Sequence, residues 1–185
     1  MRSFTYLGAV GLLVAVTGCG SSNPNNNTDG SVSTGDPIAD EWIEAHNDAR
    51  AMAGPPTPSP ELPALTWNTA GATTAQAWAE GCNWMHNPNR GNFGENIAAF
   101  SGNSTPTQTV SLWNSEKADY DYAGNTCPTG KVCGHYTQLV WRKTTSVGCG
   151  IAKCTTGSPL SGFPDWTYLV CDYAPPGNFN NAKPY

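Results

Sequence analysis

The chain has 185 residues, of which 9 are basic and 14 acidic, for a formal net charge of −5. This length and acidic balance argue against a multidomain assembly and against a basic nucleic-acid-binding protein. Only 12% of the residues are charged, whereas glycine (20), proline (15) and tryptophan (7) are abundant. The composition indicates a loop-rich globular chain with an ordinary core, and 7 cysteines are enough to brace it in an oxidising compartment.

The first 18 residues have the layout of an export signal. Arg2 precedes an apolar run over 7–16, which is too short to span a bilayer of about 30 Å. The sequence Val-Thr-Gly-Cys at 16–19 resembles the lipobox of bacterial lipoproteins, in which cleavage precedes the cysteine and a lipid is attached to its sulfur. We therefore predict a signal peptide over 1–18 and lipidation of Cys19. The alternative is an ordinary secretory signal followed by a chance cysteine.

Residues 19–35 are predicted to form the lipidated cysteine and a flexible tether, because they are rich in Asn, Ser and Gly and hold almost nothing able to enter a core. Multiple acyl chains on Cys19 would make membrane attachment effectively stable. No other stretch is apolar enough to span a bilayer. The expected location is extracytoplasmic: anchored to a membrane or the cell surface, or otherwise secreted.

Three helices are predicted in the domain that follows, residues 36–185. The first, over 36–54, opens with an Asp-Pro pair, keeps its apolar residues on one face and ends at a glycine. The second, over 68–81, is alanine-rich and lies between an asparagine N-cap and a glycine. The third begins at 105 with a Thr-Pro-Thr-Gln capping box and runs to about residue 120.

Strands are predicted where β-branched and aromatic residues lie between Gly, Ser and Pro. These segments are 94–100, 137–143, 147–154 and 166–173. Helices packed against such a mainly antiparallel sheet give an α+β layered domain.

Five polar residues are the candidates for chemistry. His46 lies in the first predicted helix, where a surface or capping role is expected. His86 and His135 lie close to cysteines, and a disulfide would hold their backbone rigidly. Glu95 and Glu116 are carboxylates among apolar and aromatic residues, so we expect them to face inward.

Two histidines with carboxylate partners suit zinc or another divalent cation. The carboxylates would be direct ligands or acceptors that fix the tautomer of the imidazoles. The alternative is a buried polar network that only joins helices to the sheet. A structural zinc bound by cysteines is disfavoured, because the chain is exported and has no CxxC spacing.

Motifs along most of the domain resemble the CAP superfamily, which groups cysteine-rich secretory proteins, insect venom antigen 5 and plant pathogenesis-related protein 1. GHYTQLVWRKT at 134–144 is similar to its first signature and YLVCDYAPPGNF at 168–179 to its second. The resemblance is strongest to the plant branch, from which Asp172 departs because asparagine is usual there. The likeness also includes HNDAR at 46–50, LTWN at 65–68, GCNWMH at 81–86, GENIA at 94–98 and LWNSEKADYDY at 112–122.

The resemblance implies a three-layer α-β-α sandwich with a cleft whose floor carries two histidines and two glutamates. In this chain that cleft tetrad falls on His86, Glu95, Glu116 and His135. Relatives bind divalent metal through the histidines, so the resemblance makes His86 and His135 the candidate ligands of zinc or another divalent cation. Glu95 and Glu116 would hold the two rings or an intervening water. Neutral imidazole binds metal, so such a site should weaken below about pH 6.

Apart from Cys19, six cysteines remain, and they allow fifteen pairings that the sequence cannot rank. Similarity to the plant branch suggests three disulfides. These are Cys82 with Cys149, Cys127 with Cys133, and Cys154 with Cys171.

The family has been linked to sterol and lipid binding, defence, ion-channel block and, in scattered cases, proteolysis, and the fold does not decide among these. The leading hypothesis is a monomeric binding module for a sterol, fatty acid or envelope ligand, with a divalent-metal site and no nucleic-acid partner. Trp84, Trp113, Trp141 and Trp166 permit apolar binding, although core packing also explains them.

Two alternatives belong to other classes. In the first, the tetrad of a metal-dependent peptidase or esterase activates a water with help from Glu95 or Glu116, the candidate catalytic residues. Ser115 and Tyr136 neighbour the tetrad, but neither is an obvious nucleophile. In the second, the tail PPGNFNNAKPY at 175–185 is released, because it resembles a defence peptide of plant relatives. The same tail would otherwise close the fold.

Overall fold

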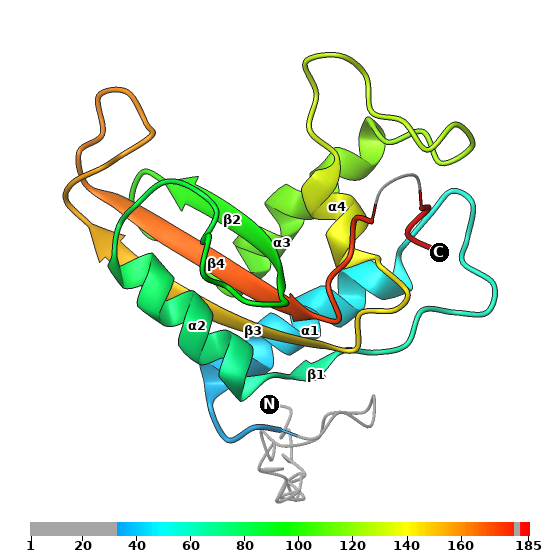
Figure 1. Cartoon of the computed structure of the whole chain (residues 1–185), viewed down its shortest axis with the longest axis horizontal. Coiled ribbons are helices and arrows are strands. Elements are labelled where there is room, and N and C mark those ends of the chain that lie inside the picture. The colour runs from blue at the N-terminus through cyan, green and yellow to red at the C-terminus, as the bar shows by residue number, and fades with distance from the viewer. Residues whose placement is uncertain (1–32, 180–181) are drawn as a thin grey trace, which may run out of the picture.

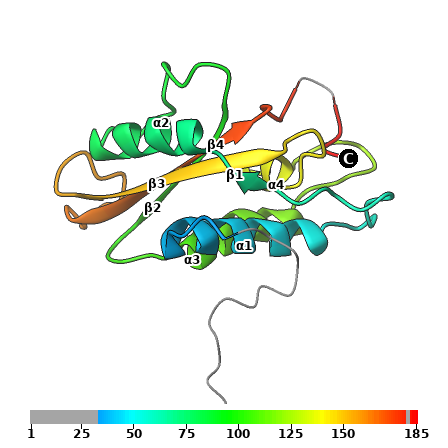
Figure 2. The same cartoon turned by 90° about the horizontal axis from the view of Figure 1, so that it is seen from below.

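The structure, a computed structural model, describes residues 33–179 and 182–185. The predicted signal peptide, Cys19 and most of the predicted tether lie outside the described residues. Within the described ranges, no helix is long and apolar enough to cross a membrane. The described chain forms three layers, in which helices cover both faces of one sheet (Figure 1 and Figure 2).

The central layer is a four-stranded sheet of order β1-β3-β4-β2. Strands β2 and β3 both pair antiparallel with β4, and β1 pairs parallel with β3. The predicted α+β class and mainly antiparallel sheet are therefore confirmed. The strand bounds are β1 Thr66–Trp67, β2 Gly94–Phe100, β3 Ser146–Cys154 and β4 Trp166–Ala174.

The three predicted helices begin where local capping predicts. In α1 (Pro37–Ala51) the Asp36 carboxylate accepts the N–H of Ile38, and α2 (Thr69–Glu80) has an asparagine cap of the same kind. The capping box is present at the start of α3 (Pro106–Ser115), which continues into a single 3-10 turn, η1 (Glu116–Ala118). Figure 2 shows α2 over one face of the sheet and α1 and α3 over the other.

Alternate side chains of β4 belong to two hydrophobic cores, one on each face of the sheet. Leu169, Cys171 and Tyr173 belong to the core beneath α1 and α3, whereas Tyr168 and Val170 belong to the core beneath α2. All five are fully buried. Neighbouring residues on a strand of this sheet therefore face different helical layers.

The predicted strand over 137–143 is wrong, because α4 (Gly134–Leu139) occupies its first half and a turn its second. The segment is rich in apolar residues, but two of its carbonyls bond to a side chain and not to a strand. The buried guanidinium of Arg50 donates to the carbonyls of Leu139 (2.8 Å) and Trp141 (3.0 Å). Carbonyls at a helix end need such donors, so this contact stabilises α4. Trp141 accordingly lies just after a helix, outside any strand.

Two of the three suggested disulfides are wrong. Cys127–Cys133 is confirmed, whereas the other bonds are Cys82–Cys154 and Cys149–Cys171. The strand register explains this, because Cys149 lies directly opposite Cys171 in the β3–β4 pair, with Cα atoms 4.1 Å apart. Cys154 at the end of β3 is then left to pair with Cys82 after α2, at a Cα–Cα distance of 5.7 Å.

Candidate functional site

The first half of the tetrad joins the loop after α2 to β2. The Nδ1 atom of His86 lies 2.6 Å from Oε1 of Glu95. The Glu95 side chain is only 1% exposed, whereas that of His86 is 55% exposed. The same carboxylate accepts the backbone N–H of Asn87 at 3.0 Å. A buried carboxylate thus holds both an exposed imidazole and the loop that carries it.

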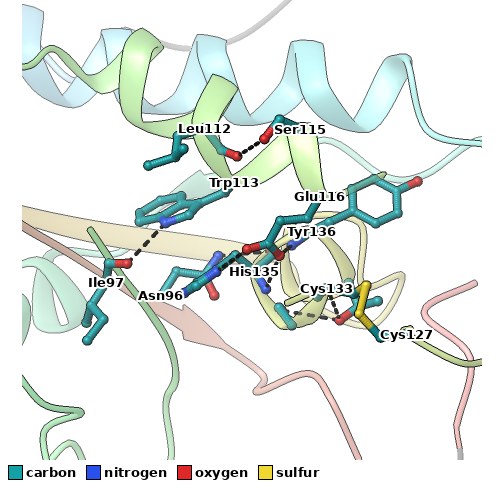
Figure 3. Close-up of polar contacts among 12 residues, drawn as sticks. Asn96, Ile97, Leu112, Trp113, Ser115, Glu116, Cys127, Cys133, His135 and Tyr136 are labelled. Carbon is teal, nitrogen blue, oxygen red and sulfur yellow. Dashed lines mark hydrogen bonds and ion pairs between the residues drawn. A yellow bond between two sulfur atoms is a disulfide. The ribbon is translucent and has the colours of Figure 1, made fainter. Parts of the chain in front are cut away.

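The second half joins η1 to the first turn of α4 (Figure 3). The Nδ1 atom of His135 lies 2.5 Å from Oε1 of Glu116, while Oε2 accepts the backbone N–H groups of His135 and Tyr136 at 3.0 and 3.1 Å. These N–H groups lie in the first turn of α4, where they have no acceptor within the helix. Trp113 stacks on the His135 ring, with the ring centroids 6.1 Å apart. Glu116 and Trp113 together fix the orientation of this imidazole.

Both pairs leave the same atom available. Each Nδ1 faces a carboxylate, so in the neutral imidazole Nδ1 carries the proton and Nε2 carries the lone pair. Among the described residues, neither His86 nor His135 has a hydrogen bond at Nε2. No three ligand atoms of the tetrad lie within 4.8 Å of one another in the described part of the chain. The structure therefore joins each histidine to one glutamate and does not gather the four into one cluster.

A chain of buried polar groups continues from His135 into the core, and sequence reasoning missed it. The Nδ2 group of Asn96 donates to the carbonyl of His135 and to the hydroxyl of Tyr173, both at 3.1 Å. The Tyr173 hydroxyl lies 2.9 Å from Nε2 of His46, whose Nδ1 lies 2.7 Å from the carbonyl of Trp42. In the sequence, the only indication of this series of polar groups was that Asn96 directly follows Glu95 in the GEN motif.

His46 is fully buried, so the expected surface or capping role is wrong. Burial lowers the pKa of its imidazole to about 4, because the charged form is poorly solvated there. Its Nδ1 faces a carbonyl, which can only accept, so Nδ1 carries the proton and Nε2 accepts from Tyr173. His46 is a neutral link between α1 and β4.

His46 also lies near two sulfur atoms, but this group is not a metal site in the oxidised protein. Its ligand atom and those of Cys149 and Cys171 all lie within 4.8 Å of one another. The two sulfurs form a disulfide, so they offer no thiolate. Both ring nitrogens of His46 already have hydrogen-bond partners.

Asp172 is a buried carboxyl opposite Glu95 in the β2–β4 register. Neither of its oxygens has a hydrogen-bond partner among the described residues. Burial above all, and then the charge of Glu95, raise the pKa of Asp172 to about 8, while Arg90 acts in the opposite direction. The carboxyl therefore holds a proton at neutral pH.

A cavity of about 470 Å³ opens between the segment before α4 and the C-terminal tail. Its wall includes the Cys127–Cys133 disulfide, and the rings of Trp141 and Phe179 pack against each other with centroids 6.1 Å apart. The lining is thus partly aromatic, with one cation, Lys131.

The other candidate residues have structural contacts. Trp113 and Trp166 are buried in the core, and Trp84, 40% exposed, packs edge-on against Trp166. Ser115 donates its hydroxyl proton to the carbonyl of Leu112 in its own helix (Figure 3). The Tyr136 hydroxyl accepts the N–H of residue 54. Among the described contacts, neither hydroxyl bonds to a tetrad side chain.

Known proteins resemble this chain over most of its domain. The profile of the cysteine-rich secretory protein family (CAP) matches residues 43–173. Pathogenesis-related leaf protein 4 of Solanum lycopersicum is 38% identical over 149 residues, covering 78% of this chain and 82% of that protein. Pathogenesis-related protein 1A of Nicotiana tabacum is 40% identical over 151 residues, covering 78% and 79%.

Solved structures share the fold. Venom allergen-like protein 4 of Schistosoma mansoni superposes with a TM-score of 0.60 at 28% identity, covering 80% of this chain and 90% of that one. NaASP2, solved with Zn²⁺, superposes with a TM-score of 0.61 at 24% identity, covering 80% and 84%. The second likeness is evidence for the fold alone.

Proposed function

The chain belongs to the cysteine-rich secretory protein family (CAP), and we propose that it is a binding module that takes up a divalent cation, zinc above all, through His86 and His135. One observation carries this proposal: each imidazole is held at Nδ1 by a carboxylate, which leaves Nε2 as the lone-pair donor. Metal-ligating histidines are usually oriented in this way, by a hydrogen bond at the other ring nitrogen.

The donor set fits zinc, which is bound by neutral imidazole and carboxylate groups. Glu95 and Glu116 fix the tautomers of the two rings. With two protein ligands, a bound cation would retain positions for water or an incoming polar group, and it would act there as a Lewis acid. Cation binding requires the His135 ring to keep its present orientation. Glu116 and Trp113 hold the ring in that orientation.

Zinc titration by calorimetry tests the proposal. The purified protein should bind Zn²⁺ with a dissociation constant on the order of 1 μM or tighter. The double variant His86→Ala/His135→Ala should lose this binding, because it removes both Nε2 atoms. The control Glu61→Gln, an exposed carboxylate on the proline-rich loop over 55–63, should bind as the wild type does. A folded wild type that binds no zinc would contradict the proposal and make the tetrad a structural network.

The protein works outside the cytoplasm, in keeping with three disulfides that need an oxidising compartment. We propose that a lipid on Cys19 anchors it and that the tether over 20–35 separates the domain from the membrane.

A second binding function is favoured by the cavity between residues 120–134 and the tail. Its lining mixes polar side chains with aromatic and apolar ones, and the aromatic and apolar part supports uptake of a sterol, fatty acid or apolar envelope component. The tail supplies part of this wall and is attached to the domain, since the carbonyl of Pro184 accepts the N–H of Arg142 and Tyr185 stacks on Tyr122. These contacts support a tail that closes the fold, in preference to one that is released.

A matched pair of variants tests the apolar ligand. Val132 and Leu112 are 58% and 47% exposed, but only Val132 lines the cavity. Val132→Ser should weaken binding of a fluorescent sterol or fatty acid about threefold to tenfold, since it removes apolar contact area. Leu112→Ser should leave it unchanged. Equal loss in both variants would indicate nonspecific adsorption to the surface.

A further inference from the structure

Two consecutive residues of β2 contact the two histidines of the tetrad. Because neighbouring strand residues face opposite sides of the sheet, Glu95 and Asn96 reach into different layers. Glu95 bonds the ring of His86 at 2.6 Å. Asn96, 1% exposed, bonds the backbone carbonyl of His135 at 3.1 Å. One short segment of an edge strand thus sets the positions of both proposed ligands.

The orientation of the Asn96 amide follows from its partners. The carbonyl of His135 can only accept, so the atom facing it must be the NH₂ group. The second proton of that group points to the Tyr173 hydroxyl, which donates in turn to His46. Each hydrogen bond in this series of polar groups therefore has one direction. Flipping the amide would place Oδ1 of Asn96 against the carbonyl oxygen of His135.

We propose that Asn96 is a positioning residue of the cation site, fixing the first turn of α4 against β2 so that the His135 ring keeps its place. This inference rests on the proposed zinc binding. Glu116 orients the ring and the N–H side of the turn, whereas Asn96 restrains its carbonyl side. The two residues restrain His135 from η1 and from β2, and loss of either would let the imidazole shift relative to His86.

The chain offers a matched control, because the same amide has a second contact. Asn96→Leu removes both donors at nearly constant size. Tyr173→Phe keeps the bond from Asn96 to the His135 carbonyl and removes the two hydrogen bonds of the Tyr173 hydroxyl, with Asn96 and with His46, on the side away from the site. Both variants leave a buried acceptor without its donor. If Asn96→Leu does not fold, Asn96→Ala removes the same amide without adding branched bulk.

Zinc affinity and the visible spectrum of bound Co²⁺ are the two readouts. Asn96→Leu should bind Zn²⁺ about 10- to 100-fold more weakly than the wild type, the usual effect of losing a group that orients a ligand. Its Co²⁺ absorption should also change, because the arrangement of ligands changes. Tyr173→Phe should stay within about threefold in affinity and keep the wild-type spectrum. Equal effects in the two variants, or none in Asn96→Leu, would overturn the inference.

Amide hydrogen exchange without metal separates this inference from the proposed function. Exchange at His135 and Tyr136 should be faster in Asn96→Leu and unchanged in Tyr173→Phe. If the wild type binds no zinc, the proposed function fails, and exchange alone then decides whether Asn96 positions His135. Unchanged exchange in Asn96→Leu would refute the positioning role whatever the zinc result.

Discussion

At the scale of the residue, Asp172 is the clearest departure from its surroundings. A carboxyl with no exposed surface and no hydrogen bond among the described residues lies opposite a second carboxylate, Glu95. Such a group is tolerated because it keeps its proton and stays uncharged. Its pKa is raised to about 8, so the proton is retained at neutral pH. Folding therefore becomes linked to proton binding at this position.

Asp172→Asn should remove that linkage. Between about pH 4 and pH 8 the folded protein keeps the Asp172 proton while the unfolded chain releases it, so stability falls as the pH rises. The slope from this residue reaches up to about 1.4 kcal/mol per pH unit. Asp172→Asn should be more stable than the wild type at pH 8, with a gain that shrinks toward pH 4.

Urea unfolding at pH 5 and pH 8 measures this difference. The control Asp165→Asn, at an exposed position before β4, should follow the wild type at both pH values. Parallel pH profiles for Asp172→Asn and the wild type would show that Asp172 ionises in the fold as it does in the unfolded chain.

At the scale of the element, α4 is stabilised by contacts from distant parts of the chain. Residues 137–139 of this helix were predicted to belong to a strand. The guanidinium of Arg50, 89 residues before Leu139, donates to the carbonyls of Leu139 and Trp141 at the C-terminal end of α4. The same guanidinium bonds the carbonyl of Pro63, so it joins α1, the proline-rich loop and α4. The helix that carries His135 therefore depends on α1.

Arg50→Met should destabilise the fold by about 3 kcal/mol or more, because it leaves buried carbonyls without donors. The matched control is Arg142→Met, since Arg142 also donates to two carbonyls, those of Pro60 and Glu61, but in exposed surroundings. Its loss should cost about 1 kcal/mol or less. Thermal unfolding of both variants gives the comparison, and similar losses would mean that burial of Arg50 adds nothing.

Features set within a few residues could be predicted from the sequence, and features set by distant pairing could not. The caps at Asp36, Asn68 and Thr105 each bond an N–H two or three residues ahead, so their motifs were sufficient. The contact of Asn96 with Tyr173 spans 77 residues and has no local signature. The four residues of the tetrad were candidates from the sequence itself and were grouped in one cleft through family resemblance, whereas their division into two histidine–glutamate pairs came from the structure.

At the scale of the whole molecule, disulfides and a series of buried hydrogen bonds hold the sheet and the helical layers together. The disulfide Cys82–Cys154 ties the end of α2 to the end of β3, and Cys149–Cys171 ties β3 to β4. On the other face, the chain from Asn96 through Tyr173 to His46 ties the sheet to α1. The proposed ligands thus lie on loops and turns that are attached to this frame at several points.

The disulfide pattern has a consequence for how the protein is made. Cys82 precedes the other five cysteines of the domain along the chain, yet its partner Cys154 follows only after Cys127, Cys133 and Cys149. An oxidase that joins cysteines in order of arrival would therefore link Cys82 to Cys127 first. The native bond requires Cys82 to wait as a thiol, or a disulfide isomerase to exchange the early bond for the final one. A compartment that oxidises thiols but does not exchange disulfides should therefore give a lower yield of native protein.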